Sequence, residues 1–266
     1  MLDARLLAQQ GFGLTRLALA TEENQQADTE ALARLDALVI RRLAGEPVAR
    51  LLGHQEFYGL DFALNAETLV PRPETELLVD LALDFVKAHP NPKLLDLGTG
   101  TGCIPIAALV NASALIAVAV DISATALMAA KANSASHGVA DRLELIEGSW
   151  FGQLPSGQKF DIIVSNPPYI ESAAIVGLSR EVREHDPLMA LDGGPDGLDP
   201  YRIIAAQAQD HLVPSGRLAV EIGSRQGAAV EILFRNADFC DVTILKDLAG
   251  LDRVVIGTAR PAMPGG

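Results

Sequence analysis

The sequence predicts an α/β protein in which a mostly parallel, seven-stranded sheet follows a small helical domain. Between residues 93 and 257, apolar runs of strand length alternate with helical segments, which is the pattern of βαβ units. A glycine-rich turn at residues 98–102 joins the first of these runs to a helix. Residues 1–47 instead show leucines at helical spacing. We therefore expect two domains, residues 1–75 and residues 76–266.

The N-terminal domain is expected to be helical and to end in a β-hairpin. A helix begins near residue 28, where Asp28 or Thr29 can cap its first turn, and Gly45 followed by Pro47 ends it. Between residues 53 and 70, apolar side chains alternate with polar ones, which indicates a hairpin. We expect this hairpin to connect the two domains.

The second domain supplies the sheet and the helices that cover it. The expected strands are residues 93–97, 115–120, 143–147, 160–165, 217–222, 242–245 and 253–257. The expected helices are residues 77–87, 104–110, 124–137, 201–212 and 226–234. Residues 171–200 are rich in turn signals, and a segment of this length without regular structure is typical of a lid or binding loop.

The glycine-rich turn and the acid that follows it predict a ligand site. Glycines let the backbone turn tightly and approach a ligand, and the amides of a helix start can hold a carboxylate. An acidic residue about 20 positions further on is placed to bind the hydroxyls of a ribose, and Asp121 lies there. A generic strand-to-helix turn explains one glycine, but not Gly98, Gly100 and Gly102 together with Asp121.

The spacing within the turn argues against a dinucleotide. Gly102 comes one residue early for the G-x-G-x-x-G pattern, and the turn has no basic neighbour to meet a phosphate. An acid ahead of the turn, Asp96, suits a nucleoside joined to a zwitterionic amino acid. S-adenosylmethionine fits that description.

The segment Asn166-Pro167-Pro168-Tyr169 follows a buried strand, at the edge where ligands bind in open α/β sheets. Asn166 offers a side-chain carbonyl, and the two prolines have no N–H, so the backbone presents acceptors on a stiff frame. Tyr169 adds a flat aromatic wall. This arrangement suits a planar –NH2 group, and amide and adenine nitrogens both fit it. Taken alone, the segment could also be a turn that ends a strand.

The composition restricts the possible partners. The 266 residues include 34 acidic and 21 basic ones, for a formal charge of −13. This acidity works against non-specific binding to nucleic acid, which depends on cationic groups. The sequence shows no bilayer-length apolar run and no signal peptide, so we expect a soluble cytoplasmic protein that binds no membrane. Histidines and cysteines form no metal-ligand spacing, and we predict no metal site.

The motifs together resemble a known family. Asp96-Leu-Gly-Thr-Gly-Thr-Gly102 with Asn166-Pro-Pro-Tyr169 resembles class I S-adenosylmethionine-dependent methyltransferases, which have a Rossmann-like sheet and here would act on a planar nitrogen. Pro71-Arg-Pro-Glu-Thr-Glu76, Gly45-Glu-Pro-Val48 and Asp192-Gly-Gly-Pro-Asp-Gly197 extend the resemblance to one family, the PrmC/HemK N5-glutamine methyltransferases of peptide chain release factors. Asn-Pro-Pro-Tyr alone is shared with adenine-N6 DNA methyltransferases.

This resemblance implies a reaction and a set of site residues. The cofactor would be S-adenosyl-L-methionine, and the substrate the glutamine of a Gly-Gly-Gln loop in a release factor. We expect the protein to act as a monomer. The implied cofactor-binding residues are Gly98, Thr99, Gly100, Thr101, Gly102, Asp121, Trp150 and Asn166. Substrate would be held by Asn166, Pro167, Pro168 and Tyr169, with Asn166, Pro167 and Tyr169 carrying catalysis.

Some positions depart from the family pattern or allow a second interpretation. Ser149 stands where the family has an acidic residue before the tryptophan, and Asp186 stands where glutamate is expected. From its residue type alone, Trp150 is equally a wall of an adenine slot or a core aromatic.

We expect the Asn166 side-chain oxygen and the Pro167 carbonyl to accept hydrogen bonds from the two N–H groups of the substrate amide.

Three other functions are alternatives. An adenine-N6 DNA methyltransferase would need a basic groove, and a nicotinamide oxidoreductase a different glycine spacing. A non-catalytic cofactor-binding module would leave the acceptor cluster of residues 166–169 unexplained.

Overall fold

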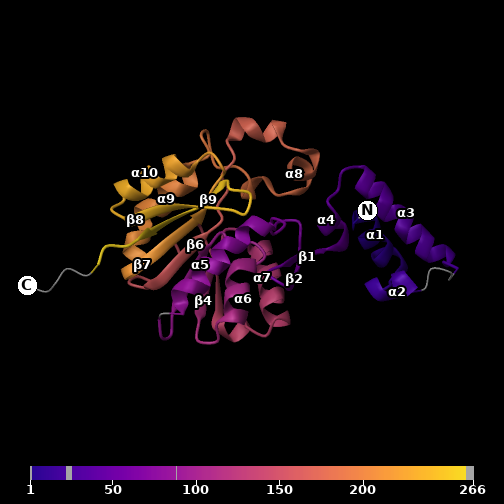
Figure 1. Ribbon diagram of the computed structural model, residues 1–266, viewed down its shortest axis with the longest axis horizontal. Coiled ribbons are helices and arrows are strands. Elements are labelled where there is room, and N and C mark those ends of the chain that lie inside the picture. Colours follow the sequence, from indigo (N-terminus) through magenta and orange to yellow (C-terminus); the bar gives the residue numbers. More distant parts are fainter. Residues whose placement is uncertain (1, 22–25, 88, 262–266) are drawn as a thin grey trace, which may run out of the picture.

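The computed structural model describes residues 2–21, 26–87 and 89–261. Its N-terminal part consists of the helices α1 (Leu2–Phe12), α2 (Arg16–Thr21), α3 (Thr29–Leu43) and α4 (Val48–Leu52). Asp28, not Thr29, caps α3, because its carboxylate accepts a hydrogen bond of 2.6 Å from the Ala31 amide. Figure 1 shows α1, α2 and α3 on one side of the molecule, away from the sheet.

The expected β-hairpin is confirmed, although it is shorter than predicted. Strands β1 (His54–Phe57) and β2 (Leu60–Ala63) pair in antiparallel register. The turn residues Tyr58 and Gly59 both have positive φ, 54° and 73°, as a two-residue hairpin turn requires. Phe57 and Phe62 are buried in the core cluster of the sheet domain, so the hairpin is fastened to that domain by apolar contacts.

The expected seven-stranded sheet is present in residues 93–258. Its strands are β3 (Lys93–Leu97), β4 (Ile116–Asp121), β5 (Leu143–Glu147), β6 (Phe160–Ser165), β7 (Leu212–Glu221), β8 (Cys240–Lys246) and β9 (Asp252–Thr258). They lie in the order β5-β4-β3-β6-β7-β9-β8. The first five pair in parallel, and β9 runs antiparallel to both of its neighbours. The predicted α/β fold with a mostly parallel sheet is therefore confirmed.

Helices cover both faces of this sheet (Figure 1). The helices α5 (Glu76–Val86) and α6 (Cys103–Asn111) pack on one face, and α9 (Asp199–Ala208) and α10 (Gly227–Asn236) pack on the other. Side chains alternate between the faces, so that Leu94 belongs to the first cluster and Leu95 to the second. The helix α7 (Ala124–Ser136) follows β4 and packs beside β5. Both faces are buried, which leaves the strand ends as the place for a ligand.

Two expected elements have clearly different boundaries in the structure. The strand β7 begins at Leu212 instead of residue 217, because the predicted turn Pro214-Ser215-Gly216 is a bulge within the strand, with Ser215 at φ 63°. The helix before it, α9, correspondingly spans Asp199–Ala208, not residues 201–212.

Residues 171–200 are less irregular than expected. They contain the short helix α8 (Arg180–His185) and two 3₁₀ helices, Ser172–Gly177 and Leu188–Ala190. Within the described ranges, no helix is both long and apolar enough to cross a bilayer.

Candidate active site

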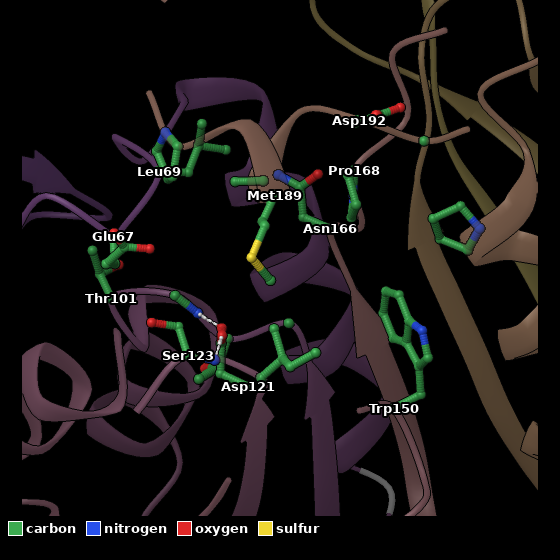
Figure 2. Close-up of a pocket in the computed structure, with 18 of the residues that line it drawn as sticks. Glu67, Leu69, Thr101, Asp121, Ser123, Trp150, Asn166, Pro168, Met189 and Asp192 are labelled. Atoms are coloured by element: carbon green, nitrogen blue, oxygen red, sulfur yellow. Dashed lines mark hydrogen bonds between the residues drawn. The ribbon is translucent and has the colours of Figure 1, made fainter. Parts of the chain in front are cut away.

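A cavity of about 570 Å³ opens at the carboxyl ends of the parallel strands. The glycine-rich turn after β3, Asp121 at the end of β4 and Asn166 after β6 all line it, because these three neighbouring strands end at one edge of the sheet. Figure 2 shows Asp121 and Ser123 on one side of the cavity and Asn166 with Pro168 on the opposite side. The structure thus brings together two motifs that are far apart in the sequence.

The turn between β3 and α6 requires glycine at its last position. Gly102 has φ 79°, and a Cβ there would lie 2.8 Å from the Ile106 side chain. The start of the turn is held to the neighbouring strand, since the amides of Gly98 and Thr99 both donate to the Val120 carbonyl. This fixed backbone lines the cavity from Gly98 to Thr101, whereas Gly102 is not among the lining residues. The contact of this turn with a ligand stays a prediction.

Asp121 is joined to the glycine-rich turn. One of its carboxylate oxygens accepts a hydrogen bond of 2.8 Å from the Gly100 amide, and the other accepts one of 2.9 Å from the Ser123 amide (Figure 2). Burial raises the pKa of Asp121, and hydrogen bonds from backbone amides oppose this rise. Each oxygen keeps a second lone pair, so the carboxylate can still accept hydrogen bonds from a pair of hydroxyls.

Asp96 lies beneath the same turn and is fully buried. Within the described part of the chain, neither of its carboxylate oxygens, nor the buried Thr99 hydroxyl, has a hydrogen-bond partner. Burial raises the pKa of Asp96 to about 7; the nearby Thr99 hydroxyl lowers it and the charge of Asp121 raises it further. A buried carboxyl group without partners is costly, and a cation bound at the turn would offset that cost.

The side-chain amide of Asn166 is fixed through its –NH2 group. Its Nδ2 donates a hydrogen bond of 3.1 Å to the hydroxyl of Thr75, which also lines the cavity. The Thr75 hydroxyl donates in turn to the Glu221 carboxylate, over 2.6 Å. The structure gives Asn166 Oδ1 no hydrogen-bond donor among the described residues, which leaves this oxygen as an acceptor at the cavity.

The other residues of the predicted substrate segment differ in position. Pro168 lines the cavity, whereas Pro167 is buried and Tyr169 is not among the lining residues. The Tyr169 ring packs against the second core cluster, and burial raises the pKa of its phenol to about 12. Their predicted contacts with substrate stay predictions.

Trp150 lines the cavity and also packs against the second core cluster, and its role as a wall for adenine stays a prediction. Its backbone has φ 51°, a conformation that is uncommon for a bulky side chain. Ser149 and Gly148, directly before it, line the cavity as well.

Sequence reasoning missed two buried polar residues and an ion cluster at this site. From the sequence, Thr75 is part only of the motif 71–76 and Glu221 only of a strand, although a glutamate in an otherwise apolar strand end is a recognisable signal. Asp186, whose side chain is 1% exposed, accepts hydrogen bonds of 2.9 Å from both Arg50 and Arg72. This cluster joins α4 to the residues directly before 187–190, which line the cavity.

Comparisons with known proteins agree with this geometry. The models of two families match the chain, a methyltransferase small domain at residues 75–181 and a PrmC N-terminal domain at residues 1–53. A release factor glutamine methyltransferase of Agrobacterium fabrum is 47% identical over 96% of this chain and 89% of its own. Another, from Rhodospirillum rubrum, is 43% identical over 98% of this chain and 80% of its own.

A solved structure supports the fold. A methyltransferase from Pyrococcus furiosus, 17% identical, superposes with a TM-score of 0.56 over 85% of this chain and 98% of its own. The similarity in sequence to the curated relatives extends over nearly the whole chain. The resemblance stated from the motifs is confirmed: the chain is a methyltransferase that belongs to the release factor glutamine methyltransferase family.

Proposed function

We propose that this protein transfers the methyl group of S-adenosylmethionine to the side-chain amide nitrogen of a glutamine, in the Gly-Gly-Gln motif of a peptide chain release factor. The observation that carries the proposal is the open carbonyl of Asn166, which faces a cavity shared with the glycine-rich turn. An acceptor in that position can hold an –NH2 group next to a cofactor bound at the turn.

The residues around the turn fit S-adenosylmethionine. Asp121 has lone pairs for the two ribose hydroxyls, and the partnerless carboxyl group of Asp96 suits the ammonium of the amino acid part. Trp150 offers a flat surface for adenine, and the turn from Gly98 to Thr101 lines the same cavity. When bound, the cofactor supplies an electrophilic methyl group on a sulfonium.

The protein's task is to orient a poor nucleophile. An amide nitrogen shares its lone pair with the carbonyl, so its approach to the methyl group must be controlled. Asn166 Oδ1 and the Pro167 carbonyl accept hydrogen bonds from its two N–H groups and stabilise the positive charge that develops on nitrogen. Correct orientation of the reacting atoms can lower the activation barrier by about 7–11 kcal/mol. After methyl transfer the amide nitrogen would carry a positive charge, and it would then lose one of its protons to water.

The proposal assigns residues 1–75 to an N-terminal helical domain. This domain would bind the release factor. The helix α3 exposes the apolar side chains of Ile40 (67%) and Leu43 (81%), which suit a protein partner. The formal charge of −13 argues for a protein substrate instead of nucleic acid. The proposal further takes the protein to act as a monomer in the cytoplasm.

A deletion tests the docking role. Removal of residues 1–47 should spare cofactor binding, measured by calorimetry, and abolish methylation of the release factor. Wild-type activity of the truncated protein would contradict docking through this part.

Substrate class can be tested with a methyl-labelled cofactor. The enzyme is incubated with a purified release factor, with the same factor carrying Gln→Glu in its Gly-Gly-Gln motif, and with duplex DNA. We expect label only in the first reaction. Label in DNA would instead support an adenine methyltransferase, and label in none would support a non-catalytic module.

A further inference from the structure

Three polar groups from distant parts of the chain form a single line of hydrogen bonds behind the cavity. Asn166 follows β6, Glu221 ends β7, and the pairing of Ser165 with Val220 sets these two residues side by side. Thr75 comes from the turn before α5 and lies between them. Thr75 and Glu221 are 3% and 1% exposed, so neither group can exchange its partner for bulk water.

The donors and acceptors in this line can be assigned from chemistry alone. An ionised carboxylate only accepts hydrogen bonds, so the single hydroxyl hydrogen of Thr75 must point to Glu221. The Thr75 oxygen can then only accept from Asn166, which requires the –NH2 side of the amide to face it. As a consequence, the carbonyl side of Asn166 faces the cavity.

We propose that Thr75 and Glu221 are positioning residues that fix the side-chain amide of Asn166 with its oxygen toward the substrate nitrogen. This inference rests on the proposed function and adds residues that act through Asn166. An asparagine amide is nearly symmetric in shape, so packing alone does not choose between its two orientations. In the reversed orientation, Asn166 would present –NH2 to the substrate –NH2, and two donors repel.

The direction of the line depends on the charge of Glu221. Burial raises the pKa of Glu221 to about 7, whereas the Thr75 hydroxyl, Arg253 and Arg72 lower it and Glu74 raises it. Three other titratable groups face it, and because the pKa of each is raised, they stay neutral near pH 7; these are Cys103, Tyr169 and Tyr201. A protonated Glu221 can donate to Thr75, which frees the Thr75 hydrogen to turn toward Asn166 and reverse the amide.

The first test uses paired substitutions at Thr75. Thr75→Val removes the hydroxyl at nearly constant volume and should lower kcat about 10-fold, the effect of one hydrogen bond. Thr75→Ser keeps the hydroxyl and should restore kcat to near the wild-type value. Thr68→Val is the matched control, because Thr68 is also buried and its hydroxyl both accepts from and donates to the Asn65 backbone. It should leave kcat unchanged.

The second test uses pH and Glu221→Gln. At saturating cofactor and release factor, the kcat of the wild type should fall as pH drops through about 7, because the carboxylate is lost. Glu221→Gln should lower kcat and remove this acidic limb. Thr75→Val with unchanged kcat, no rescue by serine, or an acidic limb that persists in Glu221→Gln would each overturn the inference.

A measurement without substrate separates this inference from the proposed function. In 15N NMR spectra, the side-chain –NH2 signals of Asn166, assigned by their absence in Asn166→Ala, should shift with pH in the wild type. They should not shift in Thr75→Val or Glu221→Gln. If this coupling is found but no release factor is methylated, the proposed function fails while the hydrogen-bond line stands; if the signals do not respond in the wild type, the line itself is refuted.

Discussion

The side chain of Asn166 donates a hydrogen bond of 3.1 Å to the hydroxyl of Thr75, a residue 91 positions earlier in the chain. This contact joins the turn before α5 to the segment after β6, at the edge of the sheet where the cavity opens. It also uses the donor side of the amide and leaves the acceptor side available. A site that must hold an –NH2 group needs that arrangement.

Replacement of Asn166 by alanine tests the acceptor. We expect Asn166→Ala to lower methyl transfer to a release factor by about 100-fold or more, a loss comparable to removal of one transition-state hydrogen bond in other enzymes. Cofactor affinity, measured by calorimetry, should weaken at most moderately. Asn236→Ala, at an exposed position at the end of α10, is the control and should keep full activity. Near-normal turnover of Asn166→Ala would remove the acceptor role.

Asp121 should contribute to cofactor affinity. Asp121→Ala removes the carboxylate proposed to bind the ribose, and a hydrogen bond to a charged group is worth about 1.5–3 kcal/mol, so the dissociation constant should rise about 10-fold or more. Asp161→Ala is a matched control, because this carboxylate accepts from the Lys93 amide at the opposite end of the sheet. Equal affinities of the two variants would exclude Asp121 from the cofactor site.

Asp96 should make cofactor binding depend on pH. Its pKa of about 7 lies far above the ordinary 3.8 because of burial, so below pH 7 the free protein holds the carboxyl group largely protonated. An ammonium beside it favours the ionised form, so binding should release a proton below pH 7. Affinity should therefore rise from pH 5 to 7 and level off above.

Calorimetry in buffers of different ionisation enthalpy measures this proton release. Asp96→Asn should abolish the pH dependence. A wild-type affinity that is constant from pH 5 to 8 would show that no cation is bound beside Asp96.

The ion cluster of Asp186 should be important for stability. Asp186→Asn leaves the guanidinium of Arg50, whose side chain is 9% exposed, without its charged partner. Breaking a buried ion pair in this way costs about 3–5 kcal/mol, which urea denaturation can measure. The control is Asp84→Asn, since Asp84 pairs with Lys87 at a site where both side chains are 72% exposed, and a pair of that kind is worth about 1 kcal/mol or less. Similar stability of the two variants would contradict this account.

Local signals in the sequence predicted most of the fold and half of the site. Three predicted parts of the site lie at or directly after the end of a strand: the turn at residues 98–102, Asp121 and the segment 166–169. Strand ends can be recognised from short apolar runs. The start of β7 was missed because Pro214-Ser215-Gly216 has the composition of a turn, whereas pairing with β6 keeps it in the sheet.

Contacts between distant segments could not be predicted in the same way. The position of Thr75 behind Asn166 depends on how α5 packs on the sheet, and no local pattern encodes it. The same is true of Asp186, which meets Arg50 only after α4 and residues 180–186 have come together. Tyr169 was expected as a wall of the site, and its ring packs into the core instead of lining the cavity, so its contact with substrate stays a prediction.

The central claim is that the Asn166 carbonyl directs one amide nitrogen toward a methyl donor bound at residues 98–102. It is tested most directly by incubating the enzyme with isotopically labelled S-adenosylmethionine and a purified release factor, followed by tandem mass spectrometry of the digested factor. We predict one labelled methyl group on the side-chain nitrogen of the glutamine in the Gly-Gly-Gln motif. A label on any other atom or residue, or an unmodified factor, would contradict the account.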